Sequence, residues 1–316
     1  MTGILSITGV IFVLIGIGYL SVRLALFSPA EMGTLGKFVV NLALPALIFR
    51  AISSRPVGEI ADPGYLGAML IGSLAVFGLG YLWSRRVAGV SPLASTFRAM
   101  GMSCANSGFV GYPVLLMALP EGAATGLALH MIVENLVMIP RVLVMAEYAR
   151  GGAGMSGGRL AVQIAGRLAR NPILIGLVLG LLVSVLGLTM PMVVWRPVDI
   201  LASSSAAVSL VVIGGTLAGV PLRSIDASVI SVVVGKLLLH PLAVGLGLVV
   251  MAGAGLGVND PQLGAAAIIM AAMPVMAVYQ ILAQSFGEGR NAALSLLVMS
   301  VASFFTISAT LAIVLP

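Results

Sequence analysis

Residues 104–113 read CANSGFVGYP, a run of small, polar and helix-breaking residues. The run interrupts a segment, 93–119, that is otherwise apolar enough to cross a lipid bilayer. A helix unwinds at membrane depth only where protein or water satisfies the freed backbone amides and carbonyls, so such a break usually lines a cavity. This run is therefore the first place to expect a bound solute.

Composition restricts the class of protein. Hydrophobic residues make up 60% of the 316 residues, charged residues make up only 8%, and the mean hydropathy is +1.16. Such a chain has too few polar residues to cover a water-soluble domain. We therefore expect an all-α polytopic membrane protein without a separate soluble catalytic domain.

Apolar stretches of roughly one membrane span each, about 20 residues, alternate with charged residues, proline and glycine. They lie at 4–27, 35–53, 64–83, 93–119, 122–147, 171–189, 198–219, 227–252, 262–286 and 291–315. The sequence thus predicts ten transmembrane helices. The first is predicted to be a retained span rather than a signal peptide, because no Lys or Arg precedes its apolar core.

Basic residues are distributed unevenly between the predicted loops. The loops after odd-numbered spans hold Arg23, Lys37, Arg85, Arg86, Arg98, Arg150, Arg159, Arg167, Arg170, Arg223 and Arg290, and the opposite loops hold only Arg50, Arg55 and Arg196. The positive-inside rule then places the odd-numbered loops in the cytoplasm and both termini outside, on the periplasmic side of a cell inner membrane. The net charge of +6 reflects this topology, and we expect no nucleic-acid partner.

The longest polar connection runs from Tyr148 to Arg170 and contains the glycine-rich sequence GGAGMSGG. Such a run is typical of a flexible linker. It divides the spans five and five, so the second half enters the membrane inverted, as in many secondary transporters. We expect a first five-helix repeat at 1–150, a cytoplasmic linker at 151–170 and an inverted second repeat at 171–316.

The fourth and ninth predicted spans carry matching prolines, Pro113 and Pro274. Proline removes a backbone hydrogen bond, so each helix should kink or split there. An ordinary kink explains either proline alone, whereas matching positions in two inverted halves indicate a substrate site near the bilayer midplane. Exposed amides at the half-helix ends would attract an anion or a carboxylate.

Polar and glycine residues around the two breaks are the candidates for substrate contact, since glycine permits close backbone approach. The predicted substrate-binding residues are Asn106, Ser107, Gly108, Gly111, Pro113, Pro274, Tyr279 and, in the second span, Asn41. Asn41 lies one turn before Pro45, and its side chain either faces the substrate cavity or hydrogen-bonds a packed neighbouring helix.

Five motifs, in order, make the chain resemble the auxin efflux carrier family, which includes the plant PIN-formed carriers and bacterial permeases associated with malate and malonate. The motifs are NLALPALIF at 41–49, the run 106–113, Asn171-Pro172, KLLLHP at 236–241, and the segment from Met273-Pro274 to Gln284. The resemblance spans essentially the whole chain.

The resemblance implies that helices 4 and 9 cross at Pro113 and Pro274, with the substrate beside the crossing. It also implies a scaffold of helices 1, 2, 6 and 7, a moving transport unit of helices 3 to 5 and 8 to 10, and a homodimer formed through the scaffold. Many members carry an asparagine four residues after the helix 9 proline, where this chain has Val278. We therefore expect Asn106, rather than its repeat counterpart, to contact the substrate.

Ionisable residues inside the spans are costly in hydrocarbon and usually face a bundle interior or an aqueous path. His130, Glu134 and Arg141 fall within about 40° of one helix face at 3.6 residues per turn. They form either a proton relay, with Arg141 as counter-charge or anion attractor, or a structural ion pair with Arg141 reaching the interface. Lys236, which matches a lysine of the family, either draws organic anions or reaches the interface, and His240 is interpreted as a packing donor.

No phosphate-binding Gly-rich Lys motif and no paired-cysteine metal site is present in the sequence, so we expect no enzyme, no cofactor and no metal. The leading hypothesis is a secondary active or facilitative transporter of a small organic anion, such as a dicarboxylate or an auxin-like carboxylate, working by alternating access. The alternative is a sodium-coupled organic anion symporter of the bile acid symporter type. That alternative expects acidic side chains at the crossing, and residues 262–287 contain none. A membrane receptor or intramembrane enzyme is disfavoured by the paired breaks.

Overall fold

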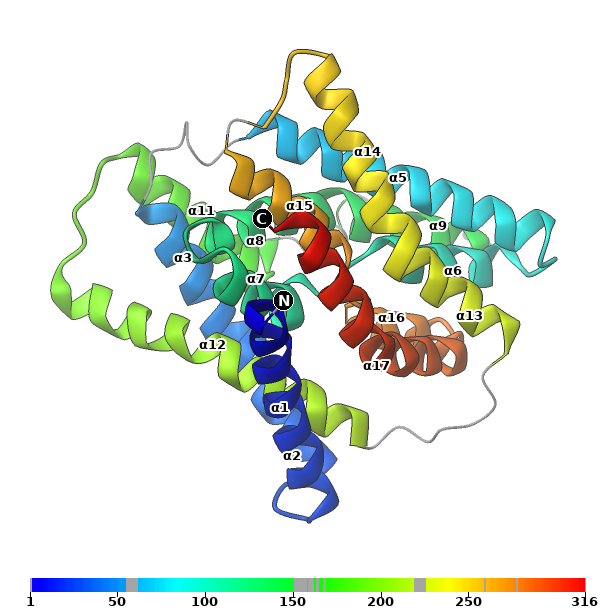
Figure 1. Ribbon diagram of the computed structural model, residues 1–316, viewed down its shortest axis with the longest axis horizontal. Helices are drawn as coiled ribbons and strands as arrows, with labels where there is room; N and C mark the ends of the chain where they lie inside the picture. The colour runs from blue at the N-terminus through cyan, green and yellow to red at the C-terminus, as the bar shows by residue number, and fades with distance from the viewer. Residues whose placement is uncertain are drawn as a thin grey trace. The chain divides into compact units, whose positions relative to one another are not determined.

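The computed structural model describes residues 2–54, 62–150, 158, 162, 165–166, 169–218, 226–258, 260–276 and 278–315. Most of the predicted linker, together with Arg55, Arg159, Arg167 and Arg223, lies outside these residues. The described part of the chain is helical and contains no β-strand (Figure 1).

Six helices in the described ranges are long and apolar enough to cross a membrane. They are Pro29–Ser53, Pro63–Arg86, Pro120–Ala149, Met192–Ala218, Ala227–Gly253 and Gly289–Val314, and the shorter apolar helices are Thr8–Arg23, Pro172–Val185 and Pro261–Ala271. The prediction of an all-helical, multi-pass membrane protein is confirmed at this level. The count of ten spans and the inverted repeat stay predictions.

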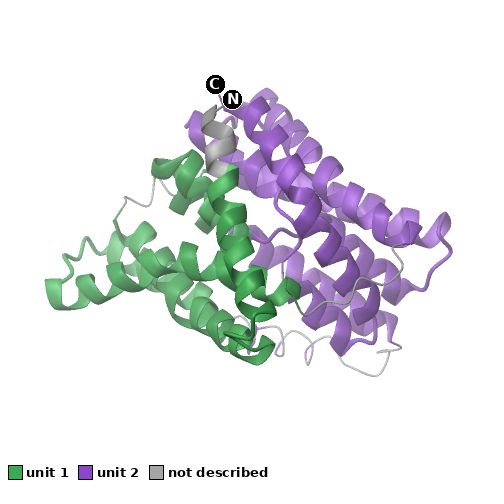
Figure 2. Cartoon of the chain, turned by 60° about the horizontal axis from the view of Figure 1, so that its bottom comes forward, with its two compact units in different colours: residues 1–62, 107–129, 168–220 green, residues 63–106, 130–167, 221–316 purple. Residues whose placement is uncertain are grey.

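The chain divides into two compact units, coloured separately in Figure 2. Unit 1 comprises residues 1–62, 107–129 and 168–220, and unit 2 comprises residues 63–106, 130–167 and 221–316. The boundary between residues 106 and 107 falls inside the polar run at 104–113. Each unit is therefore assembled from segments that are far apart in the sequence.

Unit 1 contains a closely packed helix pair, α1 and α12. Its helices are α1 (Thr2–Arg23), α2 (Pro29–Phe38), the π-helical η1 (Val39–Ala43), α3 (Leu44–Ser53), η2 (Ser107–Gly111), α7 (Tyr112–Ala118), most of α8 (Pro120–Val133), α11 (Pro172–Val185) and α12 (Met192–Ala218). A side chain at Gly214 would overlap the carbonyl of Ile15, so glycine is required where α12 approaches α1. Arg50 and Asp199 form an ion pair of 2.5 Å between α3 and α12.

Unit 2 contains the antiparallel pair α5 and α14, which lie side by side in Figure 1. Its helices are α5 (Pro63–Arg86), α6 (Pro92–Ser103), η3 (Glu134–Met138), α9 (Ile139–Ala149), α13 (Ala227–Val234), η4 (Gly235–Leu239), α14 (His240–Gly253), α15 (Pro261–Ala271), α16 (Val278–Ser285) and α17 (Gly289–Val314). Gly64 faces Leu256, and Gly72 faces Val244 without room for a side chain. The two helices therefore run in opposite directions at close range.

Several helices begin at a polar cap followed directly by proline. Asn171 accepts hydrogen bonds from the first turn of α11, and Asp260 accepts one from the first turn of α15. Ser91 does the same for α6. Proline fits the next position because the amide it lacks has no partner within the helix there.

Each of the four π-helical segments found in the described residues ends two residues before a proline. The prolines are Pro45 after η1, Pro113 after η2, Pro140 after η3 and Pro241 after η4. Proline lacks an amide and clashes with the carbonyl four residues earlier, and a wider π-turn accommodates both effects. The expected distortion at Pro113 is therefore a π-turn, whereas the gap in the helix lies earlier, at residues 104–106.

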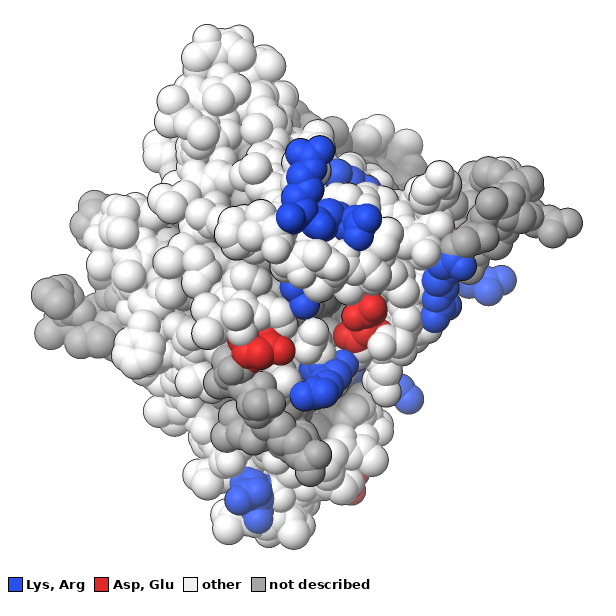
Figure 3. Space-filling view, turned by 90° about the vertical axis from the view of Figure 1, so that its right-hand side faces the viewer, with Lys and Arg blue, Asp and Glu red and all other residues white. Residues whose placement is uncertain are grey.

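Uncharged side chains make up most of the molecular face shown in Figure 3. Helix α17 illustrates the same property, since Phe305 is 71% exposed and Ile313 is 83% exposed. Large apolar side chains are tolerated on a surface that faces lipid rather than water.

Candidate functional site

The first helix interruption separates α6 from η2. Helix α6 ends at Ser103, residues 104–106 are not helical, and η2 begins at Ser107. The amide of Ala105 donates a hydrogen bond of 2.5 Å to Oε1 of Glu134. Glu134 is the first residue of η3 and is only 3% exposed, so its carboxylate is buried against the interrupted backbone.

The second interruption separates α15 from α16. Helix α15 ends at Ala271, residues 272–276 are not helical, and α16 begins at Val278. The ammonium group of Lys236 donates a hydrogen bond of 2.6 Å to the carbonyl of Ala271. Lys236 lies in η4 and is fully buried. A basic side chain thus lies at the carbonyl end of α15.

The two interruptions are joined by a backbone hydrogen bond. The amide of Asn106 donates to the carbonyl of Pro274 over 2.7 Å. Both residues belong to unit 2, and Asn106 is only 5% exposed. Two segments that the sequence marks as helix breaks, 168 positions apart (274 − 106), are therefore in direct contact.

One histidine accompanies each buried charge. Nε2 of His130 lies 3.2 Å from Oε1 of Glu134, although neither ring nitrogen has the geometry of a hydrogen bond within the described residues. Nδ1 of His240 lies 2.6 Å from Nζ of Lys236, and its Nε2 lies 2.9 Å from Oγ of Ser73. If the ammonium donates to Nδ1, the imidazole is neutral and Nε2–H donates to Ser73.

Arg141 does not join the buried pair formed by His130 and Glu134. Its guanidinium lies over the ring of Phe77, 4.2 Å from the centroid, which is a cation–π contact. The expected common face assumed a regular α-helix, but η3 begins at Glu134 itself and contains a wider turn. The spacing of 3.6 residues per turn therefore fails over this stretch.

Tyr279 packs against the end of α6. A Cβ atom added at Gly101 would lie 2.7 Å from Val232 and 2.9 Å from the hydroxyl oxygen of Tyr279. Tyr279 is 2% exposed, whereas the preceding Val278 is 43% exposed. Of the expected substrate-binding residues, Asn106, Pro274 and Tyr279 are thus close to the two interruptions within unit 2.

The other expected substrate-binding residues belong to unit 1. Buried positions in η2 and α7 are occupied by Ser107, Gly108, Gly111 and Pro113. Asn41 is exposed, donates a hydrogen bond of 2.7 Å to the carbonyl of Lys37 in its own helix, and lines a cavity of about 340 Å³ with Pro45 and Pro172.

Three partners in this site were not predicted from the sequence. Ser73 contacts His240, the amide of Ala105 contacts Glu134, and the carbonyl of Ala271 contacts Lys236. Ser73 is a small polar residue in an apolar span, which is a weak signal. The two backbone groups carry no signal beyond the helix breaks themselves.

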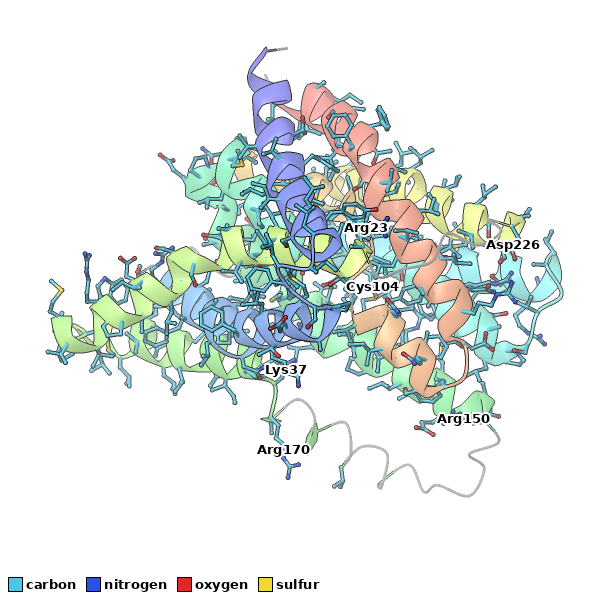
Figure 4. All side chains as sticks on the ribbon, turned by 90° about the horizontal axis from the view of Figure 1, so that it is seen from below. Arg23, Lys37, Cys104, Arg150, Arg170 and Asp226 are labelled. Carbon is cyan, nitrogen blue, oxygen red and sulfur yellow. The ribbon has the colours of Figure 1, made fainter. Side chains whose placement is uncertain are left out.

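Within the described residues, no group of three or more His, Cys, Asp or Glu side chains could hold a metal ion. Cys104, labelled in Figure 4 among packed side chains, is a free, buried thiol. The same figure marks Arg150 after α9 and Asp226 before α13, where charged residues lie at helix ends.

Apolar helices with interruptions that meet through their backbones are typical of membrane transporters. The family model described as "Membrane transport protein" matches residues 8–156 and 159–313. The chain therefore belongs to this family, the auxin efflux carriers, as its sequence motifs indicated.

Curated relatives agree with this assignment. A protein of Rhizobium meliloti (strain 1021) named "Putative malonate transporter" is 30% identical over 97% of this chain and 95% of its own length. "Uncharacterized transporter YfdV" of Escherichia coli (strain K12) is 26% identical over 66% of this chain and 67% of its own length. The family and these relatives are transporters, not enzymes.

Proposed function

We propose that the chain is a secondary active or facilitative transporter of a small organic anion, with a dicarboxylate such as malonate as the first candidate. The observation that carries the proposal is the hydrogen bond from Asn106 to Pro274, which joins two helix interruptions. Paired discontinuous helices form the substrate sites of many secondary transporters. The name of the Rhizobium relative supports the choice of dicarboxylate.

Substrate recognition in this proposal rests mainly on amide dipoles. The carboxylate of Glu134 and the ammonium of Lys236 already bond backbone groups of the chain. We assign the first substrate contact to the side chain of Asn106 and supporting contacts to the neighbourhood of Pro274 and Tyr279. The further contacts expected from the sequence are Asn41, Ser107, Gly108, Gly111 and Pro113.

The proposed mechanism is alternating access, in which unit 2 carries the solute and unit 1 serves as the scaffold. The division of the chain into two units supports this assignment of roles. Unit 1 holds the elements that correspond to the predicted scaffold helices 1, 2, 6 and 7, namely α1, α2 with α3, α11 and α12. Residues 107–129 also group with unit 1, although we expected them in the moving unit. A homodimer, proton coupling, an inner-membrane location and outward-facing termini complete the proposal.

The decisive experiment is uptake of radiolabelled malonate by proteoliposomes containing the purified protein. We expect saturable uptake that protein-free liposomes lack. A thermal-shift screen against mono- and dicarboxylates measures binding separately, because a ligand at 100 times its Kd adds about 2.7 kcal/mol of stability. If the protein shows no uptake and no carboxylate stabilises it, the proposal is contradicted.

The same vesicles discriminate against sodium coupling. Replacing external sodium by potassium leaves the proposed uptake unchanged, whereas a symporter of the bile acid type loses its driving ion. Uptake that requires sodium would favour the alternative over the function proposed here.

A further inference from the structure

We propose that Glu134 and Lys236 are positioning residues that hold the two helix interruptions open, each by bonding the backbone group that its interruption frees. This role goes beyond the proposed function, because it applies whichever solute is carried. It also replaces the two roles considered from the sequence, a proton relay for Glu134 and an anion attractor for Lys236.

The acidic side chain serves the first interruption. Ala105 lies between the end of α6 and the start of η2, and its amide donates to Glu134 instead of to a carbonyl of α6. A hydrogen bond to an ionised acceptor is roughly twice as strong as a neutral one. Negative charge is also favourable beside a helix start, where amides point outward. The carboxylate thus stabilises the unwound backbone.

The basic side chain serves the second interruption with the opposite chemistry. Ala271 is the last residue of α15, so its carbonyl belongs to the final turn, which has no partners within the helix. The ammonium of Lys236 lies 2.6 Å from this oxygen. Positive charge is favourable at a helix end. With Glu134 ionised and Lys236 protonated, the two residues add no net charge to the buried site.

Backbone distortions place both side chains. Glu134 is the first residue of η3 and Lys236 is the second residue of η4, and each π-turn precedes a proline. Single π-turns inside helices are frequent at functional sites. We infer that these turns direct the two charged groups toward the interruptions.

A histidine lies beside each of the two charged groups, in mirrored order along the chain. His130 precedes Glu134 by four residues, and His240 follows Lys236 by four residues. His240 is in turn held by Ser73 over 2.9 Å. The contacts from Ser73 through His240 and Lys236 to Ala271 are continuous, so the ammonium has one well-defined direction.

Two variants of Glu134 separate positioning from proton transfer. Glu134→Gln keeps an oxygen that accepts from Ala105 but cannot exchange a proton at neutral pH, whereas Glu134→Leu removes the acceptor at similar volume. We expect hydrogen–deuterium exchange of the Ala105 amide to be at least about tenfold faster in Glu134→Leu, because a buried charge-assisted bond is lost. Glu134→Gln should exchange within about threefold of the wild type, since a neutral bond remains.

Malonate uptake and its pH profile form the second readout. We expect Glu134→Gln to keep most of the uptake and the wild-type pH profile, and Glu134→Leu to lose at least about tenfold, as expected when a buried amide is left unpaired. If Glu134 is instead a proton relay, Glu134→Gln should show a flattened pH profile and an uptake as low as that of Glu134→Leu. That result would overturn the positioning role of Glu134.

Lys236 is tested by a parallel pair. Lys236→Met removes the donor, and Lys236→Arg keeps a charged donor, with Lys236→Gln as the uncharged donor if the guanidinium does not fit. For Lys236→Met we expect faster hydrogen–deuterium exchange in the peptide covering 266–276 and a loss of uptake. For Lys236→Arg or Lys236→Gln we expect exchange and uptake close to those of the wild type. Equal exchange and equal uptake in Lys236→Met, Lys236→Arg and Lys236→Gln would overturn the positioning role of Lys236.

Exchange in α17 is the internal standard for these variants. Unchanged exchange in α17 beside faster exchange at the interruptions supports local positioning, and faster exchange in both would overturn it. The uptake measurements rest on the proposed function, but the exchange measurements do not. A protein that fails to transport any carboxylate, yet shows the local exchange pattern, contradicts the proposed function and retains this inference.

Discussion

Asn106 has two separable roles, one in its backbone and one in its side chain. The backbone amide bonds Pro274 over 2.7 Å and joins the two interruptions. The side chain is the amide group that we assign to the substrate. A substitution that changes only the side chain therefore tests recognition without removing the bond that holds the site together.

We predict that Asn106→Ala lowers malonate uptake by about 10-fold to 150-fold, the effect of losing one hydrogen bond to a charged group, about 1.5–3 kcal/mol. The melting temperature should stay close to that of the wild type. Ser231→Ala is the control, because this hydroxyl bonds only the carbonyl of Ser228 in its own helix among the contacts described. Wild-type uptake by Asn106→Ala would reject the recognition role.

Asp226 is the capping residue of α13, and it makes stability depend on pH at the edge of the membrane. Hydrogen bonds from the hydroxyl of Ser228 and the amide of Val229 hold the pKa of the Asp226 carboxyl below its usual range. A folded-state pKa below the unfolded one means that the stabilisation is present above about pH 4 and is lost as the pH falls through the folded value.

We predict that Asp226→Ala lowers the stability at pH 7 by about 0.5–2 kcal/mol, the usual cost of removing a helix cap. Asp226→Asn should keep most of the stability at pH 7 and lose its acid dependence, because an amide caps without titrating. Thermal unfolding of both variants between pH 3 and pH 7, with the tryptophan fluorescence of Trp83 and Trp195 as the signal, measures this. Parallel curves for wild type and Asp226→Asn would contradict it.

The ends of helices were predictable from the sequence where proline and polar residues mark them. The kind of backbone distortion, a π-turn or a gap in the helix, was less predictable because it depends on packing. The run at 104–113 predicted a break, and α6 does end at Ser103. The sequence placed the break at Pro113, yet Pro113 is the second residue of α7 and follows a π-turn. A wider turn accommodates proline without unwinding the helix. The sequence alone does not distinguish a π-turn from a gap.

A substitution at Gly101 tests how closely the end of α6 is packed, and a substitution at Gly78 in the same unit is its control. Gly101→Ala puts a methyl group 2.7 Å from Val232 and 2.9 Å from the hydroxyl of Tyr279. We predict a loss of about 1–3 kcal/mol from overpacking, together with reduced uptake. Gly78→Ala in α5 meets nothing within 4 Å and should keep wild-type stability and uptake. Equal melting temperatures for the two variants would contradict the close packing.

At the scale of the whole molecule, composition and motif order were sufficient to identify the class and the family. The contacts of the candidate site were not predictable in the same way. Glu134 bonds an amide 29 residues away, and Lys236 bonds a carbonyl 35 residues away, so both depend on how separate helices pack. The i, i+4 spacing of each charge and its histidine was visible because it is local. Backbone partners were not visible because every residue has them.

We predict the orientation in the membrane from the antiparallel pair of α5 and α14 and from the positions of the arginines. Gly64 lies against Leu256, so residues 254–257 lie at the end of this pair where α5 begins, and Arg85 and Arg86 lie at its opposite end. The positive-inside rule places the arginine end in the cytoplasm. The loop after α14 should therefore face the periplasm. If the chain has the ten spans predicted from its sequence, both termini should lie on the same side.

Ala88→Cys and Ala254→Cys test this orientation as a matched pair, since both positions are exposed and lie at opposite ends of the same helix pair. The native Cys104 is fully buried and serves as the unlabelled background. A membrane-impermeant maleimide applied to the periplasmic side should label Ala254→Cys at once and Ala88→Cys only after permeabilisation. The reverse order would place the loop after α14 in the cytoplasm and would contradict the predicted orientation.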